Sequence, residues 1–160
     1  MLESQIQQTK QAIQEHIDAY PALKQDQDLL VSIPGIGRLT AAKLLGEIRN
    51  IRNFTSARQL AAYAGVTPKQ FVSGSSVHKK SRLSKTGNCN LRKMLYLPAI
   101  SAKHWNPIVH AFCERLLQSG LRPMEVIGAA MRKLLHLVFG ILKTGRPFDP
   151  NYLANLQVLS

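Results

Sequence analysis

The segment from Gly65 to Arg92 concentrates side chains that could act on a phosphate. It contains a serine followed by glycine at Ser73, and its cations include Lys79, Lys80, Arg82, Lys85 and Arg92. A serine oxygen can attack a phosphorus atom, and nearby cations stabilise the charge that develops there. A serine before a glycine is also a common turn residue. Composition alone leaves both interpretations of Ser73 open.

Positive charge extends beyond this segment. From Ile48 to Cys113, 66 consecutive residues contain no Asp or Glu and carry 11 of the 21 Lys and Arg residues. The formal net charge of the whole chain is +12. A surface of one sign attracts polyanions, and neutralised phosphates release their counterions. Nucleic acid is therefore the first partner to consider, and an acidic membrane surface is the second.

Length and composition favour one soluble helical domain. The chain has 160 residues, of which 45% are hydrophobic, so it can bury a substantial core. No apolar run approaches the roughly 18 residues of a spanning helix. The N-terminal sequence MLESQIQQTKQ lacks the pattern of a signal peptide. We expect an intracellular protein without a membrane segment.

A glycine-rich turn is the second candidate contact with nucleic acid. The sequence Ile33-Pro34-Gly35-Ile36-Gly37 separates two predicted helices. Glycines allow a tight turn and leave the first N–H groups of the next helix exposed, where a phosphate binds well. The pattern resembles a helix-hairpin-helix motif, with Arg38 and Lys43 as supporting cations. The alternative is a plain glycine turn between helices, and the surrounding charge favours the phosphate interpretation.

Hydrophobic periodicity predicts an all-α fold with one irregular basic loop. Capping residues, prolines and glycines predict helices at 22–32, from Arg38, from Thr55 or Ser56 to Gly65, from Asn90, from Pro107 to Gly120 and from Pro123. The last of these has the broad apolar face of a core helix. Pro98 predicts a kink or an interruption in the helix from Asn90. Inside the loop, Phe71, Val72 and Val77 could form a short hairpin.

The first 21 residues predict a separate amphipathic helix. One apolar stripe is formed by Leu2, Ile6, Ile13, Ile17 and Tyr20. Such a narrow stripe is typical of a helix that packs on a partner helix or enters a coiled coil. We therefore divide the chain into a linker helix (1–21), a domain (22–150) and a tail (151–160).

Acidic residues are too scattered to build a catalytic metal site. Only nine Asp and Glu residues occur, and none lies in the basic centre. Because Mg²⁺ requires carboxylate oxygens, we expect no cofactor within this chain.

Five motifs follow one another between Leu29 and Pro150: IPGIGRLTAAKLLGEI, FTSARQLAAYAGVTP, the SG pair, RLSKTGNCNLRKMLY and GRPFDP. In this order they resemble the C-terminal domain of the Piv-type DEDD insertion-sequence transposases, the bridge-RNA-guided recombinases. The resemblance implies a helix-hairpin-helix at Ile33 to Gly37. It also implies a nucleophile at Ser73 that joins covalently to DNA, with Arg82, Lys85 and Arg92 holding phosphates. If the alignment with this family is shifted, the alternative nucleophiles are Ser75, Ser76 and Ser84.

The same resemblance implies several partners. These are DNA, a structured guide RNA, further copies of the protein, and an N-terminal RuvC-like domain whose acidic site holds Mg²⁺. That domain has no counterpart in this sequence. We therefore expect the chain to be a fragment or the product of a truncated reading frame, with little or no activity alone. Its first helix would form the end of a coiled coil. We accordingly expect a bacterial protein that is located in the cytoplasm and associates with the nucleoid.

Two other functions remain open on the sequence. One is a helix-hairpin-helix module that positions DNA or RNA without catalysis. The other is a helical interaction protein with an incidentally basic surface, which tight and salt-sensitive binding to nucleic acid would exclude.

Overall fold

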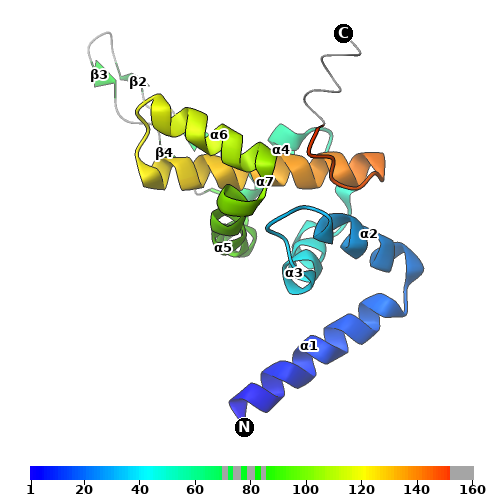
Figure 1. The fold of residues 1–160 in the computed structure, drawn as a ribbon. Coiled ribbons are helices and arrows are strands. Elements are labelled where there is room, and N and C mark those ends of the chain that lie inside the picture. The colour runs from blue at the N-terminus through cyan, green and yellow to red at the C-terminus, as the bar shows by residue number, and fades with distance from the viewer. Residues whose placement is uncertain (70–71, 74–76, 79–81, 84–85, 152–160) are drawn as a thin grey trace.

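The computed structural model describes residues 1–69, 72–73, 77–78, 82–83 and 86–151. Its helices are α1 (Leu2–Asp18), α2 (Pro21–Val31), α3 (Arg38–Ile48), the short 3-10 helix η1 (Ile51–Asn53), α4 (Ala57–Ala64), α5 (Cys89–Trp105), α6 (Pro107–Gln118) and α7 (Pro123–Thr144). Between α4 and α5 lie four short strands, β1 (Pro68–Lys69), β2 (Val72–Ser73), β3 (Val77–His78) and β4 (Arg82–Leu83). The all-α prediction is confirmed (Figure 1).

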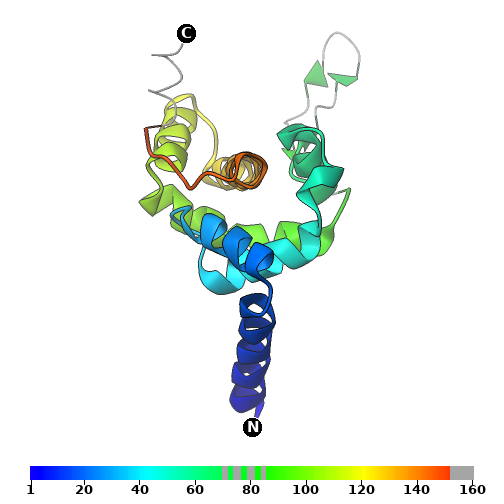
Figure 2. The ribbon, with the colours of Figure 1, turned by 90° about the vertical axis from the view of Figure 1, so that its right-hand side faces the viewer.

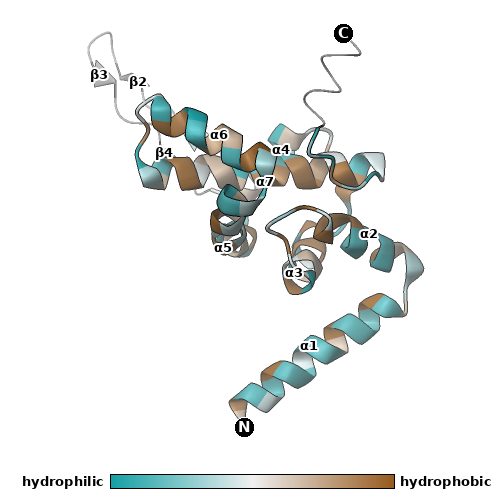
Figure 3. Ribbon diagram, in the orientation of Figure 1, coloured by the Kyte–Doolittle hydropathy of each residue, from teal (hydrophilic) through white to brown (hydrophobic). Residues whose placement is uncertain are grey.

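Helix α7 is the centre of the core. Its buried apolar residues include Val126, Ala130, Met131, Leu134, Leu135, Val138 and Ile141. Because this face is broad, α7 can pack on several helices at once. It contacts α4, α5 and α6, and Figure 2 views it almost end-on with α4 and α6 on opposite sides. In Figure 3, α7 is mostly hydrophobic and α1 mostly hydrophilic.

Local capping signals fix several helix ends where the sequence predicts them. Ser56 Oγ accepts a hydrogen bond of 3.2 Å from the backbone N–H of Gln59 and so caps α4. Gly65 ends that helix with a φ of 70°. At the start of α6, Asn106 Oδ1 accepts from the N–H groups of Ile108 and Val109.

Helix α5 continues through Pro98 from Cys89 to Trp105. A proline inside a helix removes one backbone hydrogen bond and costs about 3 kcal/mol. Of the two predicted alternatives, a kink or an interruption, the interruption does not occur, and residues on both sides of the proline are buried in the core. These residues are Leu91, Leu95, Ala99 and Ala102. Tertiary packing therefore offsets the local cost.

Helix α1 extends away from the rest of the molecule (Figures 1 and 2). Ile17 is its one buried residue. Leu2, Ile6 and Ile13, which belong to the predicted apolar stripe, are exposed. The predicted amphipathic helix is present, and most of its stripe faces solvent. None of the described helices is both long and apolar enough to cross a membrane.

The segment between α4 and α5, residues 66–86, is named the basic arm. Strand β1 pairs with β4 and β2 pairs with β3, both antiparallel, with Pro68 opposite Leu83, Lys69 opposite Arg82, Val72 opposite His78 and Ser73 opposite Val77. The predicted irregular loop thus contains two short ladders. Strands β2 and β3 form the predicted hairpin, whereas Phe71 lies outside the described residues.

Candidate nucleic-acid interface

The α2–α3 turn is packed tightly against α5. Ile33 and Ile36 are buried, and the Ile36 N–H donates a hydrogen bond of 3.0 Å to the Ile33 carbonyl. Gly35 has a φ of 109°, and a Cβ added there would lie 2.8 Å from Ala102 Cβ and 2.9 Å from Ala102 N. Asn106 Nδ2 also donates to the Pro34 carbonyl at 3.2 Å. Gly35 is therefore required by packing and by its backbone conformation, and it faces the protein.

The second glycine of the turn faces outward. Gly37 is exposed, has an ordinary φ of −87° and precedes the first residue of α3. No side chain caps this helix, and an added Cβ would meet nothing within 4 Å. The first N–H groups of a helix have no intrahelical acceptor, so this open end suits a phosphate. Of the two glycines, Gly37 is the one available to a ligand.

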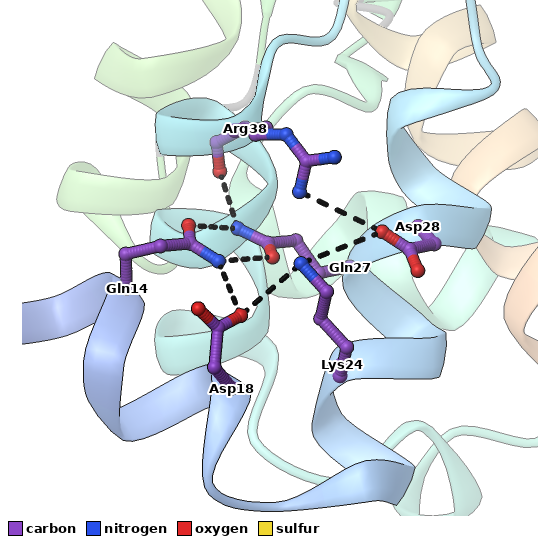
Figure 4. A network of polar contacts seen from close by, with 6 residues as sticks. All are labelled: Gln14, Asp18, Lys24, Gln27, Asp28 and Arg38. Atoms are coloured by element: carbon purple, nitrogen blue, oxygen red, sulfur yellow. Dashed lines mark hydrogen bonds and ion pairs between the residues drawn. The ribbon is translucent and has the colours of Figure 1, made fainter.

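Arg38 belongs to a polar network that joins α1, α2 and α3 (Figure 4). Buried Gln27 exchanges two hydrogen bonds of 3.0 and 2.9 Å with Gln14, and its Nε2 also donates to the Arg38 carbonyl. Arg38 Nη1 lies 3.7 Å from Asp28 Oδ1. Both side chains of that ion pair are over half exposed, so the pair is weak and leaves Arg38 available to a phosphate.

The same network includes Asp18 on α1. Hydrogen bonds from Gln14 and then Lys24 hold the pKa of Asp18 below its ordinary value.

Lys43 is exposed on α3, five residues beyond Arg38. Five residues turn a helix by roughly 140° from the starting direction, so the two cations point to different sides. The structure does not bring Arg38 and Lys43 together.

Gly87 and Asn88 fasten the end of the basic arm to its beginning. Gly87 has a φ of 134°, and an added Cβ would collide with the Tyr63 carbonyl. The Asn88 N–H donates to that carbonyl at 2.6 Å. Asn88 Nδ2 donates to Glu47 Oε2 at 2.8 Å and to the Tyr63 hydroxyl at 3.1 Å. Asn88 Oδ1 accepts from the Leu91 N–H at 3.0 Å and caps α5.

The predicted nucleophile lies on the arm, away from this joint. Ser73 occupies the end of β2, opposite Val77, and residues 74–76 connect the two strands. In Figure 1, β2 and β3 lie beyond the helical body. Arg82 pairs with Lys69 nearer the base of the arm. The remaining predicted arm residues, Lys79, Lys80, Lys85 and the rival nucleophiles Ser75, Ser76 and Ser84, lie outside the described residues.

The two predicted contact regions lie at opposite ends of α5. The arm returns at Asn88, and the glycine turn packs on Ala102. These positions are about 21 Å apart along the helix axis. Arg92 follows Asn88 by one turn of α5, so it lies on the side of the arm. A nucleic acid must be long enough to span this helix if it is to contact both regions.

Sequence analysis missed the residues that hold the arm in place. Glu47 and Tyr63 precede Asn88 by 41 and 25 residues. No local pattern connects such distant positions, and glutamate and tyrosine on helices carry no turn or capping signal. The only available clue was the Gly87-Asn88 pair, which precedes a helix as a cap does.

Comparison with known proteins identifies the family. The family model for the IS116/IS110/IS902 transposases matches residues 27–114, which include the α2–α3 turn, the basic arm and α5. The pilin gene-inverting protein of Moraxella bovis is 37% identical over 145 residues, which are 90% of this chain and 45% of that protein. The chain belongs to the IS116/IS110/IS902 transposase family. The resemblance noted from the motifs is confirmed at the level of the family.

Two further relatives have lower identity to this chain. An uncharacterized 43.6 kDa protein of insertion element IS110 from Streptomyces coelicolor is 25% identical over 153 residues, 96% of this chain and 38% of that protein. The transposase for insertion sequence element IS1111A from Coxiella burnetii is 35% identical over 82 residues, 51% of this chain and 22% of that protein. The chain thus spans less than half the length of the curated relatives it matches.

Proposed function

We propose that this chain binds DNA as part of a transposase or site-specific recombinase, and that Ser73 is the nucleophile for strand cleavage and rejoining. Membership of the transposase family carries the proposal. The joint at Gly87 and Asn88 supports it, because that joint fixes both ends of a basic arm that bears Ser73. A nucleophile on such an arm can reach a DNA strand without moving the helical core.

The proposed chemistry is phosphoryl transfer to a serine. Ser73 Oγ forms a bond to the phosphorus of a phosphodiester while its proton passes to a base. The bond from phosphorus to one deoxyribose oxygen breaks, and that oxygen takes up a proton. One strand end then remains on Ser73 as a phosphoserine ester. Attack on this ester by the hydroxyl of another strand end rejoins the DNA and releases the serine, while cations of the arm stabilise the charge on the phosphate.

Mg²⁺ does not fit the described part of this chain. No group of three His, Cys, Asp or Glu residues that could hold a metal ion occurs among the described residues. We therefore assign Mg²⁺ to a separate RuvC-like domain, and no step above depends on it. A structured guide RNA would bind through the same basic surface as DNA. The exposed stripe of Leu2, Ile6 and Ile13 supports pairing of copies through α1.

Binding of a DNA duplex over a range of salt concentrations tests the proposal. Replacing Lys79 and Lys80 by Ala should weaken binding and reduce the slope of log affinity against log salt by about 1.8, which corresponds to two lost phosphate contacts. The double variant Lys10→Ala, Arg146→Ala removes the same charge at exposed positions elsewhere and should keep the slope of the wild type. A wild-type chain that shows no salt-sensitive binding to DNA would exclude the proposed function.

The second candidate function is a binding module without a catalytic serine. The open N-terminus of α3 at Gly37 favours it, because such a site holds a phosphate without any covalent step. This candidate predicts the same binding results. It differs in predicting that Ser73→Ala leaves strand cleavage by the assembled recombinase unchanged.

A further inference from the structure

The geometry points to a second phosphate-binding surface, formed by α7 with its neighbours α4 and α6, that would take the sugar-phosphate backbone of a nucleic acid. We name it the α7 cationic face and define it by Arg58, Arg115, Arg132, Lys133 and His136. None of these residues belongs to the basic arm or to the α2–α3 turn. The inference rests on the proposed function, since it extends the DNA contact beyond the arm.

The face follows a row of residues on α7 at intervals of four. Gly128 begins the row, and a Cβ added to it would lie 3.3 Å from Leu83 Cδ1 on β4. Arg132 and His136 continue the row, and Gly140 ends it where an added Cβ would meet nothing within 4 Å. Neighbouring members of the row are four residues apart and differ by about 40° around the helix, so the row winds by about 120° over about 18 Å from the base of the arm to open space.

Two members of the row carry polar atoms whose hydrogen-bonding capacity is unused in the described part of the chain. Arg132 Nε and His136 Nε2 are buried and have no hydrogen-bond partner in the part of the chain that the structure describes. Native proteins rarely leave such atoms unpaired, because the lost hydration is not replaced. Burial, together with the charges of Arg132, Lys133 and Arg58, holds the pKa of His136 below its ordinary value. Phosphate oxygens accept hydrogen bonds from both guanidinium and imidazole N–H groups.

The α6 side of the face is also crowded with positive charge. Lys133 Nζ lies 5.3 Å and Arg115 Cζ 5.5 Å from the centre of the Phe112 ring. Burial and the charge of Arg115 lower the pKa of Lys133. Helix α4 contains no acidic residue, and α7 contains none after Glu125. On the other helix of the face, α6, Glu114 is the one acidic residue, so a phosphate would add negative charge where cations outnumber carboxylates.

The continuity with the arm favours a nucleic acid over a small anion. Leu83 places β4 directly on α7 at Gly128, one turn before Arg132. A strand held by the arm can continue along the row and bring successive phosphates to Arg132 and His136. A small anion would need only one such position, whereas the cations are spread over three helices.

The test is duplex DNA binding by the full 160-residue chain over a range of salt concentrations. Arg132→Gln with Lys133→Gln should reduce the salt slope by about 1.8 and weaken binding, while Arg132→Lys with Lys133→Arg should restore both. Arg58→Gln changes an exposed residue outside the core. It should reduce the salt slope by about 0.9. Lys10→Gln with Arg146→Gln is the charge-matched control. The ring resonances of His136 should also shift when the duplex is added.

The outcomes separate this inference from the proposed function. If the wild type binds DNA but the Gln variants match the control and the His136 resonances do not shift, the α7 cationic face is not a binding surface and the arm alone binds. If the wild type does not bind DNA, the proposed function itself fails. The inference is supported if the salt slope falls both in Arg58→Gln and in Arg132→Gln with Lys133→Gln, and if the His136 ring resonances shift when the duplex is added. This holds even where Arg132→Gln lowers stability.

Discussion

Asn88, the N-cap residue of α5, donates a hydrogen bond of 2.8 Å to the carboxylate of Glu47 on α3. The same amide group reaches Tyr63 on α4, and the side-chain oxygen caps α5. One side chain thus joins three helices at the place where the basic arm returns to the core. The position of the arm depends on this joint, and replacing Asn88 tests it.

Asn88→Ala should lower the free energy of unfolding by about 2 kcal/mol. The variant loses the cap of α5 and leaves Glu47 without its amide donor. Asn50→Ala is the matched control, because Asn50 caps only the short η1 by accepting from the Arg52 N–H. Urea denaturation of both variants measures the difference. Equal losses would mean that the contact with Glu47 adds nothing to the cap.

The two glycines of the α2–α3 turn should differ in how much stability the protein loses when each is replaced by alanine. Gly35→Ala should cost about 2 to 4 kcal/mol, since the new Cβ meets Ala102 and the positive φ disfavours a side chain. Gly37→Ala should cost no more than about 1 kcal/mol, because its φ is ordinary and its surroundings are open, although alanine is a poorer N-cap for α3 than glycine. Thermal unfolding of both variants checks this.

The same pair of variants tests the phosphate site at α3. If the exposed helix end holds a phosphate, Gly37→Ala should weaken DNA binding while the fold stays intact. Unchanged binding by that variant would remove the α2–α3 turn from the interface and leave it as a packed glycine turn.

Stability should decrease as the solution is acidified below neutrality, in part through His136. Burial and then Arg132, Lys133 and Arg58 lower the pKa of this imidazole in the folded state. The unfolded chain therefore takes up a proton first, near the ordinary pKa of 6.5, and is favoured as the pH falls from there to the folded-state pKa. Above pH 6.5 the group has no such effect, and below the folded pKa its contribution is constant.

Urea denaturation between about pH 7.5 and pH 5 measures this contribution. His136→Gln should flatten the decline in the free energy of unfolding, because the lost group no longer titrates. His104→Gln, at an exposed position on α5, controls for the loss of one histidine. An equal decline in the wild type and in His136→Gln would mean that the folded protein does not lower the pKa of His136.

Features set by neighbouring residues could be predicted from the sequence. Ser56, Gly65 and Asn106 act on backbone groups within a few positions of themselves, so their roles are visible in the local pattern. The broad apolar face of α7 likewise identified the core helix. The hairpin at Val72 and Val77 followed from β-branched residues on either side of a turn.

Features set by distant contacts could not be predicted. The local pattern places Gly35 in a glycine turn, but it does not show that Gly35 packs closely on Ala102, 67 positions away. Pro98 predicted a kink or an interruption, and the interruption is absent because α5 packs in the core, which is not a property of the local sequence. The cations of the α7 cationic face come from three helices, so no single stretch of sequence reveals their grouping.

The central claim is that Ser73 joins covalently to DNA, and a denaturing gel tests it most directly. The chain is joined to a RuvC-like domain, incubated with Mg²⁺, target DNA and the cognate guide RNA, and examined for protein attached to labelled DNA. The account predicts an adduct that disappears in Ser73→Ala and persists in Ser75→Ala, Ser76→Ala and Ser84→Ala. An adduct that survives in Ser73→Ala, or DNA cleavage without any adduct, would contradict it.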